Sequence, residues 1–165
     1  MNIIQGKVLK YGDGVNTDVI IPGKYLIYTD YKELAKHAME GIDPDFSKKI
    51  NERKIIVAGK NFGCGSSREQ APIALKYAGV QCVLADSFAR IFYRNSINIG
   101  LPILECDSVS GKVDDADELR IDFRKGLVED VSKGIRLETH PVPGFLLEIM
   151  EKGLVKYIKE KRDRI

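Results

Sequence analysis

The stretch Gly59-Lys-Asn-Phe-Gly-Cys-Gly-Ser-Ser-Arg-Glu69 places three glycines, two serines and an arginine between two periodic segments. The preceding residues 54–58, Lys-Ile-Ile-Val-Ala, predict a short buried strand, and residues 69–78 predict a helix. Glycine has no Cβ, so this turn lets backbone N–H groups approach a ligand closely. Free N–H groups and the macrodipole favour a bound anion at a helix N-terminus. The stretch therefore predicts a strand–turn–helix unit with an anion site in its turn.

Arg68 strengthens the prediction of an anion site. If the helix begins as expected, Arg68 lies in its first turn, where a cation opposes the helix dipole. Its presence there indicates that an anionic partner lies nearby.

Ser66 and Glu69 allow two interpretations. S-x-x-E forms a capping box when it opens a helix, and this explains both residues without any function. It explains neither the three glycines nor Arg68. Alternatively, Ser66 is a general base whose alkoxide is stabilised by backbone N–H groups and the arginine. Both interpretations stay open from the residues alone.

Other chemistries fit the turn less well. It matches neither a P-loop nor a G-x-G-x-x-G fingerprint. Cys64 also precedes a helix N-terminus and could be a thiol nucleophile. However, neither His37 nor His140 has a sequence-level reason to be its base, so a buried packing role is favoured for Cys64.

Composition limits the classes of protein. The 165 residues predict a single domain over 1–165, with an ordinary 44% of hydrophobic and 30% of charged residues. A net charge of +2 indicates no nucleic-acid surface. No apolar run approaches the ~18 residues of a membrane span, and the N-terminal residues lack the apolar core of a secretory signal. We therefore expect a cytoplasmic protein without nucleic-acid or membrane partners.

Metal ligands are not grouped in this sequence. The three cysteines, Cys64, Cys82 and Cys106, are far apart, and none belongs to a C-x-x-C pair. The two histidines are also far apart and lack ligand spacing. We therefore expect no metal or cluster bound by this chain alone, so a metal needed for the chemistry must come from another polypeptide.

The order of predicted elements indicates a mixed α/β fold. After a first strand at residues 3–10, residues 54–104 alternate strand, turn, helix, strand, helix and strand, as parallel strands with right-handed crossovers do. Residues 119–137 then predict three short strands separated by charged turns. Helical stretches are predicted at 30–40, 44–52 and 145–151, and 154–164 predicts a basic amphipathic tail.

Two further segments contain candidate functional residues. Asn16-Thr-Asp-Val-Ile-Ile-Pro22 predicts an Asx-type turn that leads into a strand. Lys24-Tyr-Leu-Ile-Tyr-Thr-Asp30 is apolar and aromatic in a polar neighbourhood, and its simplest interpretation is a small surface helix. Arg90 and Arg94 share one face of a predicted helix and could bind carboxylates, although solvated arginines are commoner.

Taken together, these residues resemble the small, swivel-domain subunits of the aconitase superfamily. The resemblance is greatest to the short, archaeal-type small subunits of 3-isopropylmalate dehydratase and covers essentially the whole chain. Four motifs carry it, in the family order: Asn16-Thr-Asp-Val-Ile-Ile-Pro22, Asn61-Phe-Gly-Cys-Gly-Ser-Ser-Arg-Glu-Gln-Ala71, Ala85-Asp-Ser-Phe-Ala-Arg-Ile-Phe-Tyr-Arg-Asn-Ser96 and Gly100-Leu-Pro102. Broader aconitases have an acidic residue in place of Cys64 and histidine in place of Gln70, so the likeness is to dehydratases and not to aconitase itself.

The resemblance implies an aconitase-type swivelling β/β/α domain with a mixed sheet flanked by helices. It implies a hydro-lyase that is active only with a large subunit carrying a [4Fe–4S] cluster, on di- or tricarboxylate substrates; self-association is left open. In leucine biosynthesis, the reaction converts 2-isopropylmalate to 3-isopropylmalate through an alkene. Homoaconitase, a methylated-malate hydratase and a non-catalytic anion-binding assembly module are the alternatives.

The resemblance also implies roles for individual residues. Ser66 is similar to the catalytic serine that removes a proton from substrate carbon, and Asp18 to the active-site aspartate of the T-D motif. Arg68 is similar to the residue that grips a substrate carboxylate, assisted by Ser67.

The loop Tyr25-Leu26-Ile27-Tyr28 resembles the segment that contacts the variable group of the substrate. Homoaconitase-like relatives have an arginine in this loop, whereas residues 25–29 contain no basic residue. An apolar loop suits an isopropyl group and would leave an added carboxylate unpaired. The expected substrate is therefore isopropylmalate.

Overall fold

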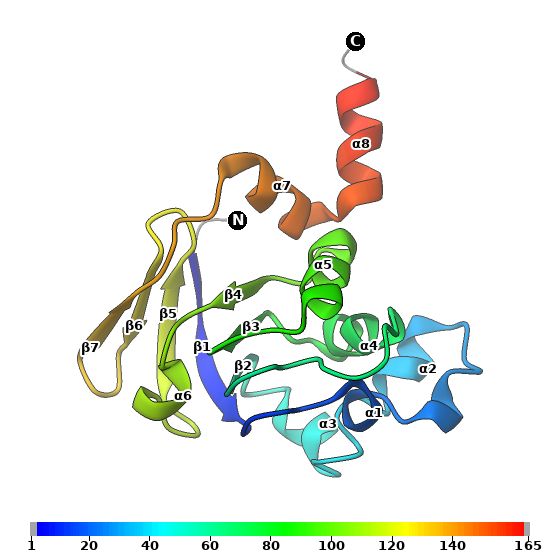
Figure 1. The fold of residues 1–165 in the computed structure, drawn as a ribbon, viewed down its shortest axis with the longest axis horizontal. Coiled ribbons are helices and arrows are strands. Elements are labelled where there is room, and N and C mark those ends of the chain that lie inside the picture. Colours follow the sequence, from blue (N-terminus) through cyan, green and yellow to red (C-terminus); the bar gives the residue numbers. More distant parts are fainter. Residues whose placement is uncertain (1–2, 164–165) are drawn as a thin grey trace.

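The computed structural model describes residues 3–163, which form a seven-stranded mixed sheet with helices on both faces (Figure 1). The expectation of a mixed sheet flanked by helices is confirmed. Along the sheet the strand order is β4-β3-β2-β1-β5-β6-β7. The strands are β1 (Ile3–Lys10), β2 (Ile55–Ala58), β3 (Cys82–Ala85), β4 (Ile103–Glu105), β5 (Glu118–Asp122), β6 (Leu127–Asp130) and β7 (Ile135–Glu138).

Eight α-helices and one 3₁₀ turn are described within residues 3–163. They are α1 (Thr17–Ile20), η1 (Gly23–Tyr25), α2 (Tyr31–Ala35), α3 (Phe46–Lys49), α4 (Gln70–Ala78), α5 (Arg90–Ile99), α6 (Val109–Lys112), α7 (Gly144–Lys152) and α8 (Leu154–Arg162). The helices expected at 30–40 and 44–52 are shortened to α2 and α3. Met39, with a φ of +59°, leaves the helical conformation before the expected end of the first one. The single turn α6 was not predicted.

The strands β2 to β4 are parallel, as the alternating pattern over residues 54–104 predicts, and β1 also pairs in parallel with β2. In the register of the first pair, Val8 lies opposite Ile55 and Lys10 opposite Val57. The strands β2 and β3 are buried along their whole lengths, which is why both are apolar at every position. Helices α4 and α5 make the crossovers between β2, β3 and β4.

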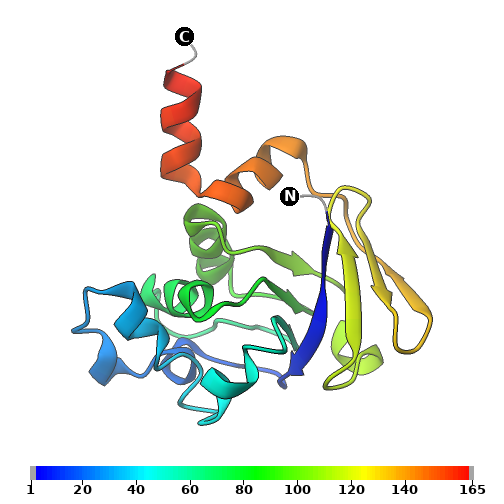
Figure 2. The same ribbon diagram turned by 180° about the vertical axis from the view of Figure 1, so that it is seen from behind.

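Each face of the parallel strands has its own hydrophobic core. One face packs against α1 to α5, where Phe46, Phe62 and Leu75 are fully buried. The other packs against α6, α7 and the antiparallel strands, and Phe123 and Met150 are buried there. The helices α1, α2, α3 and α4 therefore lie together on one side of the sheet (Figures 1 and 2).

The strands β5 to β7 extend the sheet as an antiparallel meander. β5 pairs with β1, with Ile4 opposite Ile121, and then with β6. Their side chains alternate between buried and partly exposed positions, as a strand with one covered face requires. This half of the sheet completes the second core and lies away from the loops described below.

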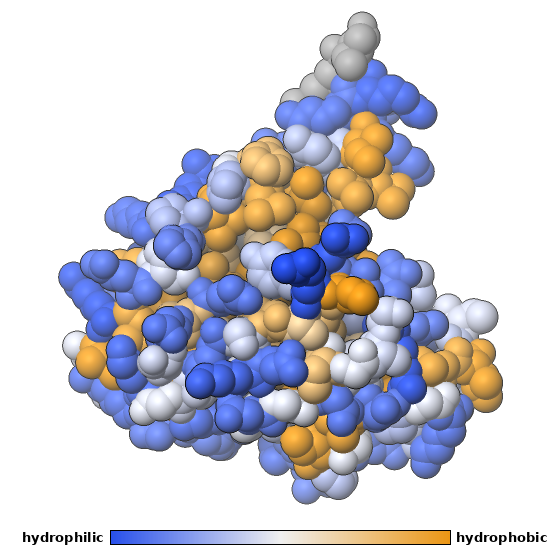
Figure 3. All heavy atoms as spheres, in the orientation of Figure 1, coloured by the Kyte–Doolittle hydropathy of each residue, from blue (hydrophilic) through white to orange (hydrophobic). Residues whose placement is uncertain are grey.

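The last helix projects from the body of the protein. Helix α8 has no buried residue, and its apolar residues Val155 and Ile158 are exposed. Figure 3 shows apolar side chains of α7 and α8 near the base of this projection. The predicted amphipathic tail is thus helical from Leu154 to Arg162. Of the predicted segment 154–164, residue 164 lies outside the described range.

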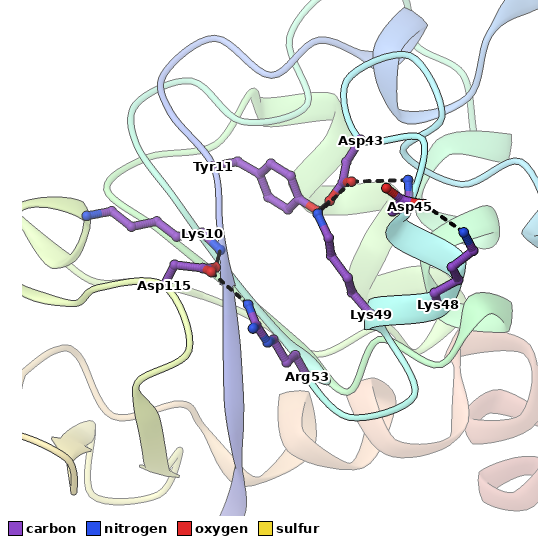
Figure 4. Close-up of polar contacts among 8 residues, drawn as sticks. All are labelled: Lys10, Tyr11, Asp43, Asp45, Lys48, Lys49, Arg53 and Asp115. Carbon is purple, nitrogen blue, oxygen red and sulfur yellow. Dashed lines mark hydrogen bonds and ion pairs between the residues drawn. The ribbon is translucent and has the colours of Figure 1, made fainter.

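A polar network fastens the segment around α3 to the end of β1 (Figure 4). The Tyr11 hydroxyl donates to Asp43 Oδ2 at 2.9 Å, and Lys49 Nζ lies 2.8 Å from Asp43 Oδ1. Nearby, Arg53 Nη1 lies 2.7 Å from Asp115 Oδ2, which ties the same segment to the start of β5. Each charge in this network therefore has an opposite charge beside it.

The network shifts the pKa values of its members. Burial by itself would raise the pKa of Asp43, but hydrogen bonds from Lys49 and Tyr11 outweigh it, and the pKa lies below the usual range. Burial and the bond to Asp43 raise the pKa of Tyr11. A carboxyl group with a lowered pKa stabilises the fold above its unfolded pKa, and this stabilisation is lost as pH falls through its folded pKa.

None of the helices between residues 3 and 163 has the length and apolar composition that crossing a membrane requires. The expectation of one domain over 1–165 stays a prediction, and residues 1–2 and 164–165 lie outside the described range.

The first prediction concerns Tyr11→Phe. Removing the hydroxyl should lower the free energy of unfolding at pH 7 by about 1 kcal/mol, because Asp43 loses one hydrogen bond while the ring still packs. The loss of stability on acidification below about pH 4 should also become smaller, because the folded pKa of Asp43 moves toward its unfolded value.

Urea unfolding between pH 3 and 7 measures both effects. Tyr77→Phe is the matched control, since no hydrogen bond of its hydroxyl is described within residues 3–163. Equal pH dependence in the wild type and Tyr11→Phe would contradict the assignment.

Candidate functional site

Two loops that follow neighbouring parallel strands form the site. Residues 11–22 leave β1 and residues 59–69 leave β2, and the carboxyl ends of paired parallel strands lie at the same sheet edge. A parallel bridge pairs Asn16 with Cys64. Thr17 N donates to Cys64 O at 2.8 Å, and Gly63 N donates to Val15 O at 2.8 Å. Segments almost fifty residues apart are therefore held side by side by backbone bonds.

Glycine is required where the second loop crosses α5. Gly63 has a φ of +79°, and a Cβ placed there would lie 2.1 Å from Cγ of the buried Phe92. Gly65 has a φ of +93° and faces Thr17. The two glycines therefore allow left-handed backbone conformations, and Gly63 also allows close packing on Phe92. These roles are separate from the access of a ligand to the backbone N–H groups.

The first loop begins a helical turn and not the strand that the sequence indicated. Asn16 caps α1, because its Oδ1 accepts a hydrogen bond from Val19 N at 3.0 Å. The side-chain bond of Asn16 reaches the third residue on, as a helix N-cap and not as the predicted Asx-type turn, and the strand predicted after it is wrong. Local capping starts the turn, and the buried Ile20 and Ile21 fix it to the core.

Arg68 does not lie in the first turn of α4, so the expectation that its charge opposes the dipole from within that turn is wrong. The N-cap of α4 is Glu69, whose side chain makes no cap bond, so the capping box predicted for Ser66 and Glu69 is absent. The guanidinium of Arg68 forms an ion pair with Asp18, and its Nη1 donates to Ile21 O at 3.1 Å. The anionic neighbour of Arg68 is thus a side chain of this protein.

The Arg68–Asp18 pair joins the two loops and keeps donors free. The side chain of Arg68 is 21% exposed and that of Asp18 is 62% exposed, so the pair lies at the surface. A guanidinium carries five N–H donors, and the contacts to Asp18 and Ile21 use only part of them. Arg68 can therefore stay paired with Asp18 and still donate hydrogen bonds to a second oxyanion.

Ser66 contacts the buried Thr17. Thr17 Oγ1 donates to Ser66 O at 3.1 Å, and the two hydroxyl oxygens lie 3.3 Å apart. Ser66 and Ser67 are exposed. Within the described chain, the backbone N–H groups of residues 65–68 donate no hydrogen bond. The turn therefore combines an exposed hydroxyl with several backbone N–H groups that have no partner in the described chain.

The loop Tyr25–Tyr28 lies beside this surface. A Cβ built on Gly23, where the loop begins, would lie 3.9 Å from both terminal nitrogens of Arg68. Tyr25 and Leu26 are half-buried against the core, whereas Ile27 is 79% exposed. The simple surface helix expected here is a 3₁₀ turn followed by a second turn at Tyr28.

The remaining candidates stay outside the cluster. Cys64 is half-buried, not buried as expected, and its Sγ lies 3.6 Å from Gly14 O. Arg90 and Arg94 are exposed and form no ion pair within residues 3–163. In the same range, no group of three or more His, Cys, Asp or Glu side chains is placed to hold a metal ion.

Sequence reasoning missed Thr17 as a member of the site. Its side chain is 1% exposed and bonds to Ser66 from a position 49 residues away. Within the triplet Asn16-Thr-Asp18, Asn16 predicts a turn and Asp18 resembles an active-site carboxylate. No local sequence pattern assigns a role to Thr17. Only the pairing of the two loops could have identified it.

Comparisons with known proteins agree on a family. The model described as the aconitase C-terminal domain matches residues 15–108. The chain is 52% identical to the isopropylmalate/citramalate isomerase small subunit of Methanocaldococcus jannaschii, over 97% of this chain and 96% of that protein. It is 55% identical to the 3-isopropylmalate dehydratase small subunit of Halothermothrix orenii, over 94% of this chain and 95% of that protein.

A solved structure confirms the expected architecture. The crystal structure of 3-isopropylmalate dehydratase from Methanocaldococcus jannaschii superposes with a TM-score of 0.90 at 48% identity, covering 97% of this chain and 95% of that chain. The aconitase-type swivelling domain expected from the sequence is therefore the observed fold.

The second prediction concerns Gly63→Ala. The new methyl group would collide with Phe92 and would also occupy a left-handed backbone conformation, so stability should fall by roughly 2–4 kcal/mol. Gly111→Ala is the control, because a Cβ at Gly111 meets nothing within 4 Å. Urea unfolding measures both variants. Equal stability of Gly63→Ala and the wild type would contradict the described path of the loop.

Proposed function

Since the chain belongs to the family of 3-isopropylmalate dehydratase small subunits, built on the aconitase C-terminal domain, we propose that it is one half of such a hydro-lyase. With a large subunit, it interconverts 2-isopropylmalate and 3-isopropylmalate by dehydration and rehydration in leucine biosynthesis, in the cytoplasm. The observation that carries this proposal is the turn 65–68, which presents Ser66 and free N–H groups beside the Arg68–Asp18 pair.

Ser66 is the proposed base that takes a proton from substrate carbon. A serine hydroxyl is a weak base unless its alkoxide is stabilised, and this turn offers two sources of stabilisation. The Thr17 hydroxyl, which donates to Ser66 O in the structure, lies 3.3 Å from Ser66 Oγ and can turn its proton to the alkoxide. The N–H groups of residues 65–68 are free within the described chain. In the rehydration step, the protonated Ser66 gives a proton to the neighbouring carbon, which had carried the hydroxyl, while water adds to the carbon that lost its proton.

Arg68 is the proposed clamp for a substrate carboxylate, assisted by the hydroxyl of Ser67. The planar guanidinium can make two parallel hydrogen bonds to a carboxylate, which fixes both distance and orientation. Asp18 and the carbonyl of Ile21 hold the guanidinium from the side of the first loop. Asp18 is therefore the proposed active-site carboxylate that orients the clamp next to the substrate.

The large subunit is the proposed carrier of a [4Fe–4S] cluster. The cysteines of this chain fit such a group poorly, because Cys82 and Cys106 are buried in the second core and Cys64 is turned to a backbone carbonyl. When bound in the partner, the cluster supplies the Lewis acid that assists departure of the hydroxyl. The residues of this chain supply the base and part of the carboxylate clamp.

The substrate's variable group is proposed to meet the loop Tyr25, Leu26, Ile27 and Tyr28. The exposed apolar side chain of Ile27 suits an isopropyl group, and no basic residue in the loop would pair with an extra carboxylate.

A second substrate has specific support. The relative from Methanocaldococcus jannaschii is named for citramalate as well as isopropylmalate. Citramalate carries a smaller apolar group at the variable position, which an apolar loop also accommodates. Activity on both malates is therefore the alternative that we retain.

The third prediction tests the base. Ser66→Ala, mixed with the cognate large subunit, should assemble normally but lower the turnover of 2-isopropylmalate by at least about 100-fold, because the proton acceptor is lost. Ser47→Ala is the control, since Ser47 is exposed on α3 and makes no described hydrogen bond. The isomerisation rate and the yield of complex are measured together. Full activity of Ser66→Ala would remove Ser66 from the mechanism.

A further inference from the structure

Three aromatic rings stack behind the loop that is proposed to contact the substrate. The centroids of Tyr25 and His37 are 3.7 Å apart, and the planes are inclined by 7°. The ring of Tyr28 is inclined by 7° to that of His37, with centroids 5.9 Å apart. The two tyrosines of the loop are therefore aligned on one imidazole ring that belongs to a different segment.

A single carboxylate connects the loop to this imidazole. The Tyr25 hydroxyl donates to Glu40 Oε1 at 2.7 Å, and His37 Nδ1 lies 2.6 Å from Glu40 Oε2. Both oxygens of Glu40 are thus engaged, one by the loop and one by the imidazole. The bonds from Tyr25 and His37 hold the pKa of Glu40 below its usual range.

The residues behind the loop are anchored to the core. His37 and Glu40 follow α2, whose Leu34 and Ala35 are buried. Between them, Met39 is fully buried, and its N–H donates to Ile20 O in α1 at 2.7 Å. The support of the loop therefore rests on the same helix that carries Asp18.

Ile27 is the most exposed side chain of the loop. Ile27, which lies between the anchored Tyr25 and Tyr28, is 79% exposed. Because its neighbours are fixed on both sides, the direction in which Ile27 points is determined by residues that do not belong to the loop. A loop that selects between substrate groups must hold its contact residue in a defined position, since misplacement by about 1 Å can cost about 100-fold in rate.

We propose that His37 and Glu40 are positioning residues that fix the Tyr25–Tyr28 loop and thereby set the selectivity for the substrate's apolar group. This inference rests on the proposed function, because it takes the loop to contact the substrate. Neither residue touches the reacting atoms. Both act through Tyr25 and Tyr28 on the placement of Ile27.

The test compares Glu40→Ala, Glu40→Gln and the control Glu33→Ala. Glu33 lies on α2, shortly before His37 and Glu40, and within residues 3–163 its carboxylate pairs only with the exposed Lys36. Glu40→Ala removes both contacts, whereas Glu40→Gln keeps an acceptor for the Tyr25 hydroxyl and should rescue the defect in large part. The chains are studied alone for loop structure and with the cognate large subunit for kinetics.

The first readout is independent of activity. Limited digestion with chymotrypsin, followed by mass spectrometry, measures cleavage after Tyr25, Leu26 and Tyr28. In Glu40→Ala, cleavage in this loop should be faster by at least about tenfold, because the loop opens locally more often. Glu33→Ala should be cleaved like the wild type. An unchanged rate of loop cleavage in Glu40→Ala would overturn the proposal.

The second readout is selectivity. For Glu40→Ala, the ratio of kcat/KM for 2-isopropylmalate to that for citramalate should change by roughly tenfold, through KM more than kcat, and Glu40→Gln should restore it. A faster loop cleavage with an unchanged ratio would overturn the positioning role. If the wild type itself isomerises neither malate, the proposed function fails, while the cleavage assay still decides whether Glu40 holds the loop.

Discussion

The contact between Arg68 and the first loop is the interaction on which the site depends. Arg68 follows β2, whereas Asp18 and Ile21 follow β1, and the guanidinium binds both. An ion pair at the surface contributes little to stability, in the range of ~0–1 kcal/mol. The pair matters because it fixes positions. It holds the guanidinium of Arg68 and the carboxylate of Asp18 together, close in sequence to the exposed Ser66. The guanidinium also lies next to Gly23, where the Tyr25–Tyr28 loop begins.

This contact exists because the sheet brings the two loops together. β1 and β2 are neighbouring parallel strands, so the chain leaves both at the same edge. The bridge between Asn16 and Cys64 then fixes the alignment, and Gly63 lets the second loop pass over Phe92. The antiparallel strands β5 to β7 cover the opposite core and take no part in the site. Fold and site are therefore connected through the order of two strands.

Much of the fold follows from local patterns, but the contacts of the site do not. The buried strands and the glycine turn before α4 are recognisable, because burial on both faces and a run of glycines each have a clear signature. By contrast, Arg68 was expected in the first turn of the helix but precedes its N-cap Glu69, and α1 was taken for a strand. The place of Arg68 depends on bonds to a segment almost fifty residues away, and Thr17 was missed for the same reason. The turn α1 begins with the local cap of Asn16, and Glu40 was missed although its partners lie only 3 and 15 residues away.

We propose that this chain contributes half of an active site, in which Arg68 holds a substrate carboxylate. The most direct measurement is the KM of Arg68→Lys for 2-isopropylmalate, assayed with the cognate large subunit. Arg136→Lys, on β7 and paired with Glu129, is the matched control. KM should rise at least about tenfold for Arg68→Lys alone, because lysine cannot make two parallel bonds to a carboxylate. An unchanged KM for Arg68→Lys would contradict it.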